Sequence, residues 1–154
     1  MELTIAQPGR LFKRVLIAFW ALFFSFVALT NLVDLLDTLG AFDWTFLNSQ
    51  NYEYVRSVVV VYDVGTPLTK LLLAGALLIE TVGAVLFWRA AVGAGRALVA
   101  LSWGACVWIA FIVMTEFFVA YKAESVFREL LTMTIVTALA VALIRDDAGA
   151  AAEA

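Results

Sequence analysis

The chain has 154 residues, 64% of them hydrophobic and 15% charged, and a net charge of −3 at pH 7. Soluble domains are roughly 45–50% apolar, and a fold of this size has too little interior for the excess, so the composition excludes an ordinary soluble domain. With no histidine and one cysteine, Cys106, an internal disulfide and a Ser-His hydrolase are excluded, and no metal, cofactor or nucleic-acid partner is expected.

Four stretches are long and apolar enough to cross a bilayer, which takes about 20 predominantly apolar residues in a helix. They cover residues 15–36, 68–88, 97–121 and 126–144. Together they predict an all-α fold: one integral membrane domain over residues 1–154, built as a four-helix transmembrane bundle in contact with the lipid bilayer.

The first stretch follows the basic residues Arg10, Lys13 and Arg14. It is too long and too aromatic for a signal peptide, so we expect it to be retained as a span. The positive-inside rule then predicts a multi-pass protein of the plasma or inner membrane, with the N-terminus and the C-terminus both cytoplasmic. Asn31 and Asp34 lie near the outer end of this span.

The connection over residues 37–66 is predicted to be one long extracytoplasmic loop. It contains the β-branched run Val58–Val61, which is too short to cross a membrane. This run predicts either a strand-like piece or an amphipathic segment that lies over the mouth of the bundle. The loop then serves either as an interfacial cover or as a lid over a binding site.

Glu80 lies in the middle of the second span, where a carboxylate costs roughly 2.5 kcal/mol or more to insert. Ala76, Gly83 and Ala84 lie on the same helical face, and small residues mark the close approach of another helix. We therefore expect Glu80 to point into the bundle. Its expected roles are a structural hydrogen bond to a backbone carbonyl or to Thr137, a proton or ligand site, or a contact with a partner subunit.

Turn-forming residues separate the remaining spans. Gly93 and Gly95 predict a tight turn before the third span, and Thr66 followed by proline predicts the capped start of the second. A second tight turn is predicted over residues 122–125, with Ser125 capping the fourth helix.

The other polar side chains of the spans fall toward their outer ends. We expect them to form an outer vestibule above Glu80, although a salt-bridge network around Asp34 and Glu116 would also account for them. The candidate proton or ligand site comprises Glu80, Glu116, Asp34 and Asn31, with Lys70 and Arg128 as supporting charges.

Several short motifs lie along the spans and the first connection: Asn31-Leu-Val-Asp34, Asn51–Val55, Glu80, Trp108, Phe111, Glu116–Phe118 and Phe127-Arg128. They resemble the motifs of an uncharacterised bacterial family of small four-span integral membrane proteins, domain of unknown function 2165. The resemblance implies that Asn31, Asp34, Glu80 and Glu116 belong together, and it implies no settled activity. Residues 80–89 are also similar to the DoxX-like proteins.

Three functions are consistent with this pattern. Small size, tight hairpins and the lack of a catalytic set favour a non-enzymatic accessory subunit or assembly factor, in a homo-oligomer or a larger membrane complex. The alternative is a proton-coupled transporter or channel for a small molecule that uses Glu80 as its protonatable group. The third is a quinone-binding or membrane-embedded enzyme that uses Asp34, Glu80 and Glu116.

Overall fold

The computed structural model describes residues 8–41, 47 and 49–144, and the regular elements within these residues are helices. The long helices are α1 (Pro8–Thr38), α3 (Thr66–Ala91), α4 (Ala97–Phe117) and α5 (Tyr121–Leu143). In the described part of the chain, these four are long and apolar enough to cross a membrane. A short helix α2 (Asn51–Val59) and a 3-10 turn η1 (Val60–Tyr62) precede α3. The predicted all-α fold with four apolar helices is confirmed.

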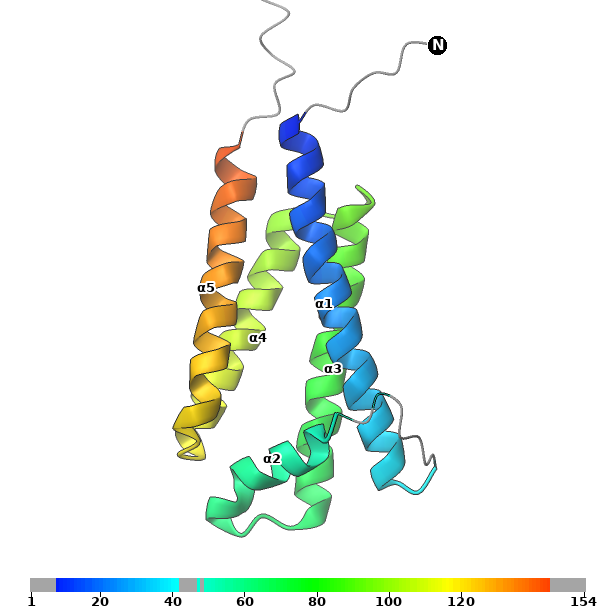
Figure 1. The fold of residues 1–154 in the computed structure, drawn as a ribbon, viewed down its shortest axis with the longest axis vertical. Coiled ribbons are helices and arrows are strands. Elements are labelled where there is room, and N and C mark those ends of the chain that lie inside the picture. The colour runs from blue at the N-terminus through cyan, green and yellow to red at the C-terminus, as the bar shows by residue number, and fades with distance from the viewer. Residues whose placement is uncertain (1–7, 42–46, 48, 145–154) are drawn as a thin grey trace, which may run out of the picture.

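The long helices form two pairs. α1 packs most extensively against α3 and α4 against α5, and contacts between α3 and α4 join the pairs (Figure 1). The start of α1 and the end of α5 lie at one end of the bundle, whereas α2 lies at the opposite end, which we call the α2 end. Each helix keeps exposed apolar side chains, as expected for contact with lipid.

An aromatic cluster from α1, α3 and α4 forms the core. The ring of Phe24 lies 5.3 Å from that of Phe87 and 5.2 Å from that of Trp108, measured between centroids. Trp20 stacks on Phe87 at 6.2 Å. Phe24 and Phe87 are completely buried, so this cluster fixes how the two helix pairs meet.

The small residues around Glu80 lie where the sequence predicted them. Gly83 and Ala84 are buried against α1, and a Cβ atom on Gly83 would lie 2.6 Å from Cδ1 of Phe24. The lack of a side chain at this position therefore lets α1 approach α3 closely enough to bury Glu80 between them.

The turn between α4 and α5 comes earlier than predicted. α4 ends at Phe117 and α5 already begins at Tyr121, so residues 122–125 are helical and their prediction as a turn is wrong. The chain reverses at Val119, whose φ of 57° is left-handed. The polar start of α5 stays helical because two of its residues, Ala123 and Glu124, are buried.

Two predicted caps are also wrong. Ser125 lies inside α5 and donates to the carbonyl of Lys122, and Thr66 is the first helical residue after the cap position, Gly65. Neither helix has a side-chain cap, because the cap positions hold glycine and alanine, which offer no side-chain acceptor. The predicted glycine turn is confirmed, since Gly93 has a φ of 80°.

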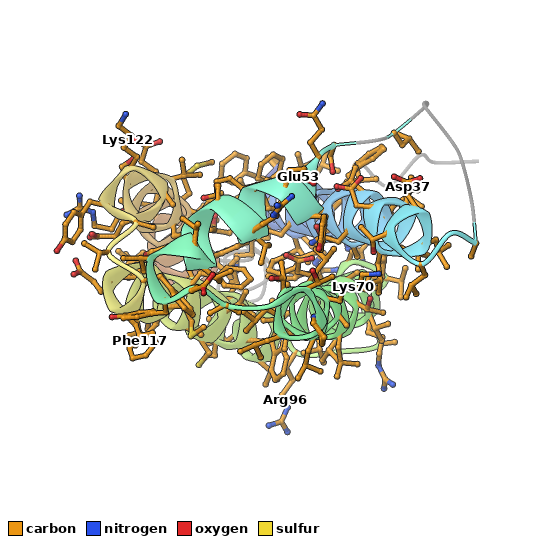
Figure 2. All side chains as sticks on the ribbon, turned by 90° about the horizontal axis from the view of Figure 1, so that it is seen from below. Asp37, Glu53, Lys70, Arg96, Phe117 and Lys122 are labelled. Atoms are coloured by element: carbon orange, nitrogen blue, oxygen red, sulfur yellow. The ribbon has the colours of Figure 1, made fainter. Side chains whose placement is uncertain are left out.

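The connection between α1 and α3 is partly helical rather than an open loop. Of the two predicted structures for Val58–Val61, the strand-like one is wrong, because these residues end α2 and enter η1. α2 is amphipathic and lies across the α2 end of the bundle (Figure 2). η1, which continues the chain from α2, contacts the end of α4: the hydroxyl of Tyr62 donates to the carbonyl of Phe117 at 2.8 Å.

Two tryptophans join α5 to the rest of the bundle. Nε1 of Trp20 donates to Oγ1 of Thr137 at 3.1 Å, and Nε1 of Trp108 donates to Oγ1 of Thr134 at 3.0 Å. All four side chains are buried. Burying an indole N–H without an acceptor costs free energy, so the two threonines stabilise the contact of α5 with the tryptophans.

The hydrogen bond between Trp20 and Thr137 gives a double-mutant prediction. Trp20→Phe and Thr137→Val are each expected to destabilise the bundle, and their effects are expected to fall short of additivity by about 0.5–1.5 kcal/mol. Reversible unfolding in bicelles measures this coupling. Thr132→Val is the matched control, because exposed Thr132 bonds only the carbonyl of Arg128 and its coupling to Trp20→Phe should be zero. Equal coupling in both pairs would refute the prediction.

Candidate functional site

A chain of side-chain hydrogen bonds runs from α2 through α1 to Glu80 in α3. Nδ2 of Asn51 donates to Oδ1 of Asn31 at 2.7 Å, and Nδ2 of Asn31 donates to Oε2 of Glu80 at 2.5 Å. Both amides donate in the direction of Glu80, so the carboxyl group is the final acceptor of the chain. Glu80 is only 3% exposed, and among the described residues no group donates to its second oxygen, Oε1.

Asp34 holds the start of α2 against α1. Its Oδ1 accepts from the backbone N–H of Ser49 at 3.1 Å, and its Oδ2 accepts from the Ser49 hydroxyl at 3.1 Å and from the backbone N–H of Tyr52 at 3.3 Å. The backbone N–H of Asn51 also donates to Oδ2. These N–H groups have no partner inside the helix, and a carboxylate at a helix N-terminus also interacts favourably with its dipole. Asp34 therefore caps α2 from a neighbouring helix.

A cavity of about 240 Å³ lies between α2 and the long helices. Its polar lining includes Asn31, Asn51, Glu80 and Thr115, and its apolar lining includes Val55, Val59, Leu73, Phe111, Phe118 and Phe127. Pockets for drug-sized ligands measure roughly 300–1,000 Å³, so this space suits a smaller molecule or part of a larger one. Because α2 contributes several of the lining residues, its position determines the size and shape of the cavity.

Tyr54 of α2 also lines this cavity. Burial raises the pKa of its phenol above the ordinary value of 10.0. The hydroxyl group therefore keeps its proton to a higher pH than the phenol of an exposed tyrosine does.

The structure brings three of the four candidate site residues together. Asn31 and Glu80 line the cavity directly, and Asp34 positions the helix that covers it. Glu116, the fourth, is exposed on α4 and lies beside Glu124 of α5. It contributes nothing to the cavity, whereas its neighbour Thr115 does.

The two supporting charges act elsewhere. Nζ of Lys70 donates to the carbonyl of Thr38 at the end of α1, and Arg128 forms an ion pair with Glu124 at 3.1 Å. Figure 2 shows Lys70 on the side of α1 and α3, far across the α2 end from Lys122 at the start of α5. The outer charges are therefore not gathered into one vestibule.

Of the hydrogen-bond partners considered for Glu80, Thr137 is wrong. Thr137 accepts from Nε1 of Trp20 in α1 and donates its single O–H to the carbonyl of Met133 in its own helix, so it has no proton left for Glu80. Glu80 instead faces Asn31, because the close packing at Gly83 places α1 and not α5 next to this part of α3.

Asn51 is the residue that sequence reasoning did not select as part of the site. A polar residue outside a predicted span is ordinary, so its only signal was the resemblance of Asn51–Val55 to a family motif. Its side chain also donates to Oγ1 of Thr30 at 3.4 Å, which ties α2 to two successive residues of α1.

The site is made of hydrogen-bonding groups. Within the described residues, no group of three Cys, Asp or Glu side chains is placed to hold a metal ion. The fold and the site together define a multi-pass α-helical membrane protein with a buried carboxyl group beside an apolar cavity. Comparison of the chain with protein-family models, with curated proteins and with solved structures finds no match.

Proposed function

We propose that this protein is a non-enzymatic membrane carrier that binds a small, mainly apolar amine in the cavity beneath α2. The observation that carries this proposal is Glu80, a buried carboxyl group that lines the cavity with one oxygen lacking a partner among the described residues. Ionisable groups inside membrane bundles are costly and usually serve a substrate or proton pathway.

The chemistry of the lining selects the ligand class. Apolar side chains of α2, α3 and α4 suit a hydrocarbon body, and a protonated amine donates to Oε1 of Glu80 while balancing the buried charge. A proton on the carboxyl group would balance the charge equally well. Proton and amine therefore compete for one group, which is what the exchange of one for the other requires.

Replacing Glu80 by glutamine tests the proposal. The glutamine side chain keeps a carbonyl oxygen for Asn31 but carries no charge, so we expect the bundle to fold and the affinity for an aliphatic amine to fall about tenfold or more. A hydrogen bond to a charged group contributes about 1.5–3 kcal/mol, and 1.4 kcal/mol corresponds to a factor of ten. Radiolabelled hexylamine binding to protein in vesicles measures the loss, and amine uptake driven by a proton gradient should disappear.

Glu116→Gln is the matched control for this experiment. It removes a carboxylate from a neighbouring span outside the cavity, so its amine binding should equal that of the unaltered protein. Hexanol, which has a similar hydrocarbon body and no charge, should lose little affinity in Glu80→Gln. Unchanged hexylamine binding in a folded Glu80→Gln variant would overturn the proposal.

The family resemblance is a further part of this proposal. It groups Asn31, Asp34, Glu80 and Glu116. The first three are supported as a unit, because the segment at the start of α2 donates to Asn31 and Asp34, and Asn31 donates to Glu80. We propose the same membrane placement as the basic residues predict, with both termini cytoplasmic, so that α2 and the cavity entrance face outward.

An accessory role in a membrane complex is the second candidate function. It is favoured by Glu116, a carboxylate on the outer surface of a span, where a cation of a partner protein would stabilise it. Extraction from native membranes in mild detergent, followed by native mass analysis, tests this role. A stoichiometric larger protein would support it, and its absence would count against it.

A further inference from the structure

The outward face of α5 carries a regular stripe of exposed residues. They are Ser125, Glu129, Thr132, Val136, Leu139 and Leu143, at alternating spacings of four and three residues. This spacing repeats every seven residues and is typical of a helix seam that packs along a second helix at a shallow angle. α5 is also the least buried of the four membrane-spanning candidates.

The polar part of this stripe extends about three turns into α5. Glu129 is about 12 Å from the start of α5 at 1.5 Å per residue, and Thr132 is about 16 Å from it. At a similar distance from the end of α4, the exposed residue is Ile109, which is apolar and suits contact with lipid. Glu129 has no ion-pair partner within the described residues, so contact with lipid would leave its charge uncompensated.

The charges on this face complement one another. Arg128 is exposed next to Glu129, and both line a shallow hollow of about 480 Å³ together with Ser125, Thr132 and Met133. Arg128 already pairs with Glu124, but a guanidinium group has five N–H donors and can serve a second carboxylate. A residue of each sign therefore lies at nearly the same depth on one face.

We propose that the stripe on α5 is the interface with a second copy of this chain, related by a two-fold axis along the membrane normal. Such an axis places equal depths opposite each other, so Arg128 of each copy meets Glu129 of the other and both charges are satisfied. The hollow is filled by the same side chains of the second copy, with Thr132 near the axis. The inference is independent of the ligand proposed for the cavity.

Disulfide formation between copies tests this interface. Cys106 is first replaced by alanine, since it is the only native thiol, and Thr132→Cys is introduced. A disulfide requires Cα atoms within about 7 Å, and the proposed axis brings residue 132 of one copy close to residue 132 of the other. Oxidation in native membranes is therefore expected to join two copies rapidly. Leu78→Cys on α3 is the matched control: it is exposed, lies about 18 Å from the α2 end of its helix, and should react at least tenfold more slowly.

A charge reversal separates the proposed interface from random collision. Glu129→Lys places cations opposite cations, so it should slow crosslinking at residue 132 at least fivefold while leaving the slow reaction at residue 78 unchanged. The proposal is overturned if residue 132 reacts no faster than residue 78, if Glu129→Lys has no effect, or if mass analysis shows residue 132 joined to a different protein. Far-ultraviolet circular dichroism confirms that each variant remains helical.

Discussion

Replacing Asp34 by alanine is expected to lower the free energy of opening α2 by about 2–3 kcal/mol, because it removes the only acceptor that the structure shows for several N–H groups of that helix start. Hydrogen exchange measures this effect. The protection of the amides in residues 51–59 should fall roughly 30- to 150-fold, since each 1.4 kcal/mol corresponds to a factor of ten. Amides in the aromatic core around Phe24 should keep their protection.

Two further substitutions define the cause of the effect. Asp34→Asn keeps one carbonyl oxygen as an acceptor but loses the charge, so its loss of protection should be intermediate. Asp37→Ala removes an exposed carboxylate one turn further along α1 and should change nothing (Figure 2). If Asp37→Ala and Asp34→Ala weaken α2 equally, the effect comes from the net charge of this end of the bundle and the capping role is wrong.

The cavity should respond to the same change. Because α2 contributes much of the cavity lining, a detached α2 is expected to weaken amine binding even though Asp34 does not line the cavity. Binding to Asp34→Ala that matches binding to the unaltered protein would show that α2 is not needed to form the site.

Replacing Gly83 by alanine is expected to destabilise the bundle by about 2–3 kcal/mol. The new Cβ atom would lie 2.6 Å from Cδ1 and 2.8 Å from Cε1 of the Phe24 ring. This ring cannot move aside, because it is completely buried and stacks between Phe87 and Trp108. α1 must therefore shift away from α3, which also lengthens the hydrogen bond from Asn31 to Glu80. The midpoint of reversible unfolding in bicelles measures the loss.

Gly75→Ala is the matched control in the same helix. A Cβ atom at Gly75 meets nothing within 4 Å, so this change should stabilise the protein by about 0.5–1 kcal/mol through the higher helix propensity of alanine. Combining Gly83→Ala with Phe24→Leu should recover part of the loss, because leucine frees the space that the new methyl group needs. Equal effects at the two glycines would show that backbone propensity, and not packing, decides stability here.

Much of the fold follows from composition and hydropathy. Four apolar stretches require four helices, because a chain in lipid must satisfy its backbone polar groups internally. The inward direction of Glu80 also follows locally, since Gly83 and Ala84 share its helical face. The ends of the helices follow less well. α5 begins at Tyr121, ahead of the predicted start at residue 126, because burial of Ala123 keeps a polar segment helical that hydropathy does not favour.

The site itself was predicted in part. Asn31, Asp34 and Glu80 stand out because polar groups are costly in a span. Glu116 stands out for the same reason, yet its side chain is exposed and lies outside the cavity. The sequence could not show this, because it does not tell which face of α4 packs against α5. Asn51 was missed because its importance arises only when α2 folds back onto α1.

The sequence by itself determined that this is a helical membrane protein with a carboxyl group in the middle of its second span, because hydrophobicity is a property of each segment alone. Only the tertiary structure decided what that carboxyl group meets. The hydrogen-bond partner of Glu80 is Asn31, which lies in a different helix 49 positions earlier in the chain. The helix that covers the cavity, α2, is held in place by Asp34. Such contacts depend on how helices pack, and packing depends on shape at Gly83 and Phe24 rather than on hydropathy.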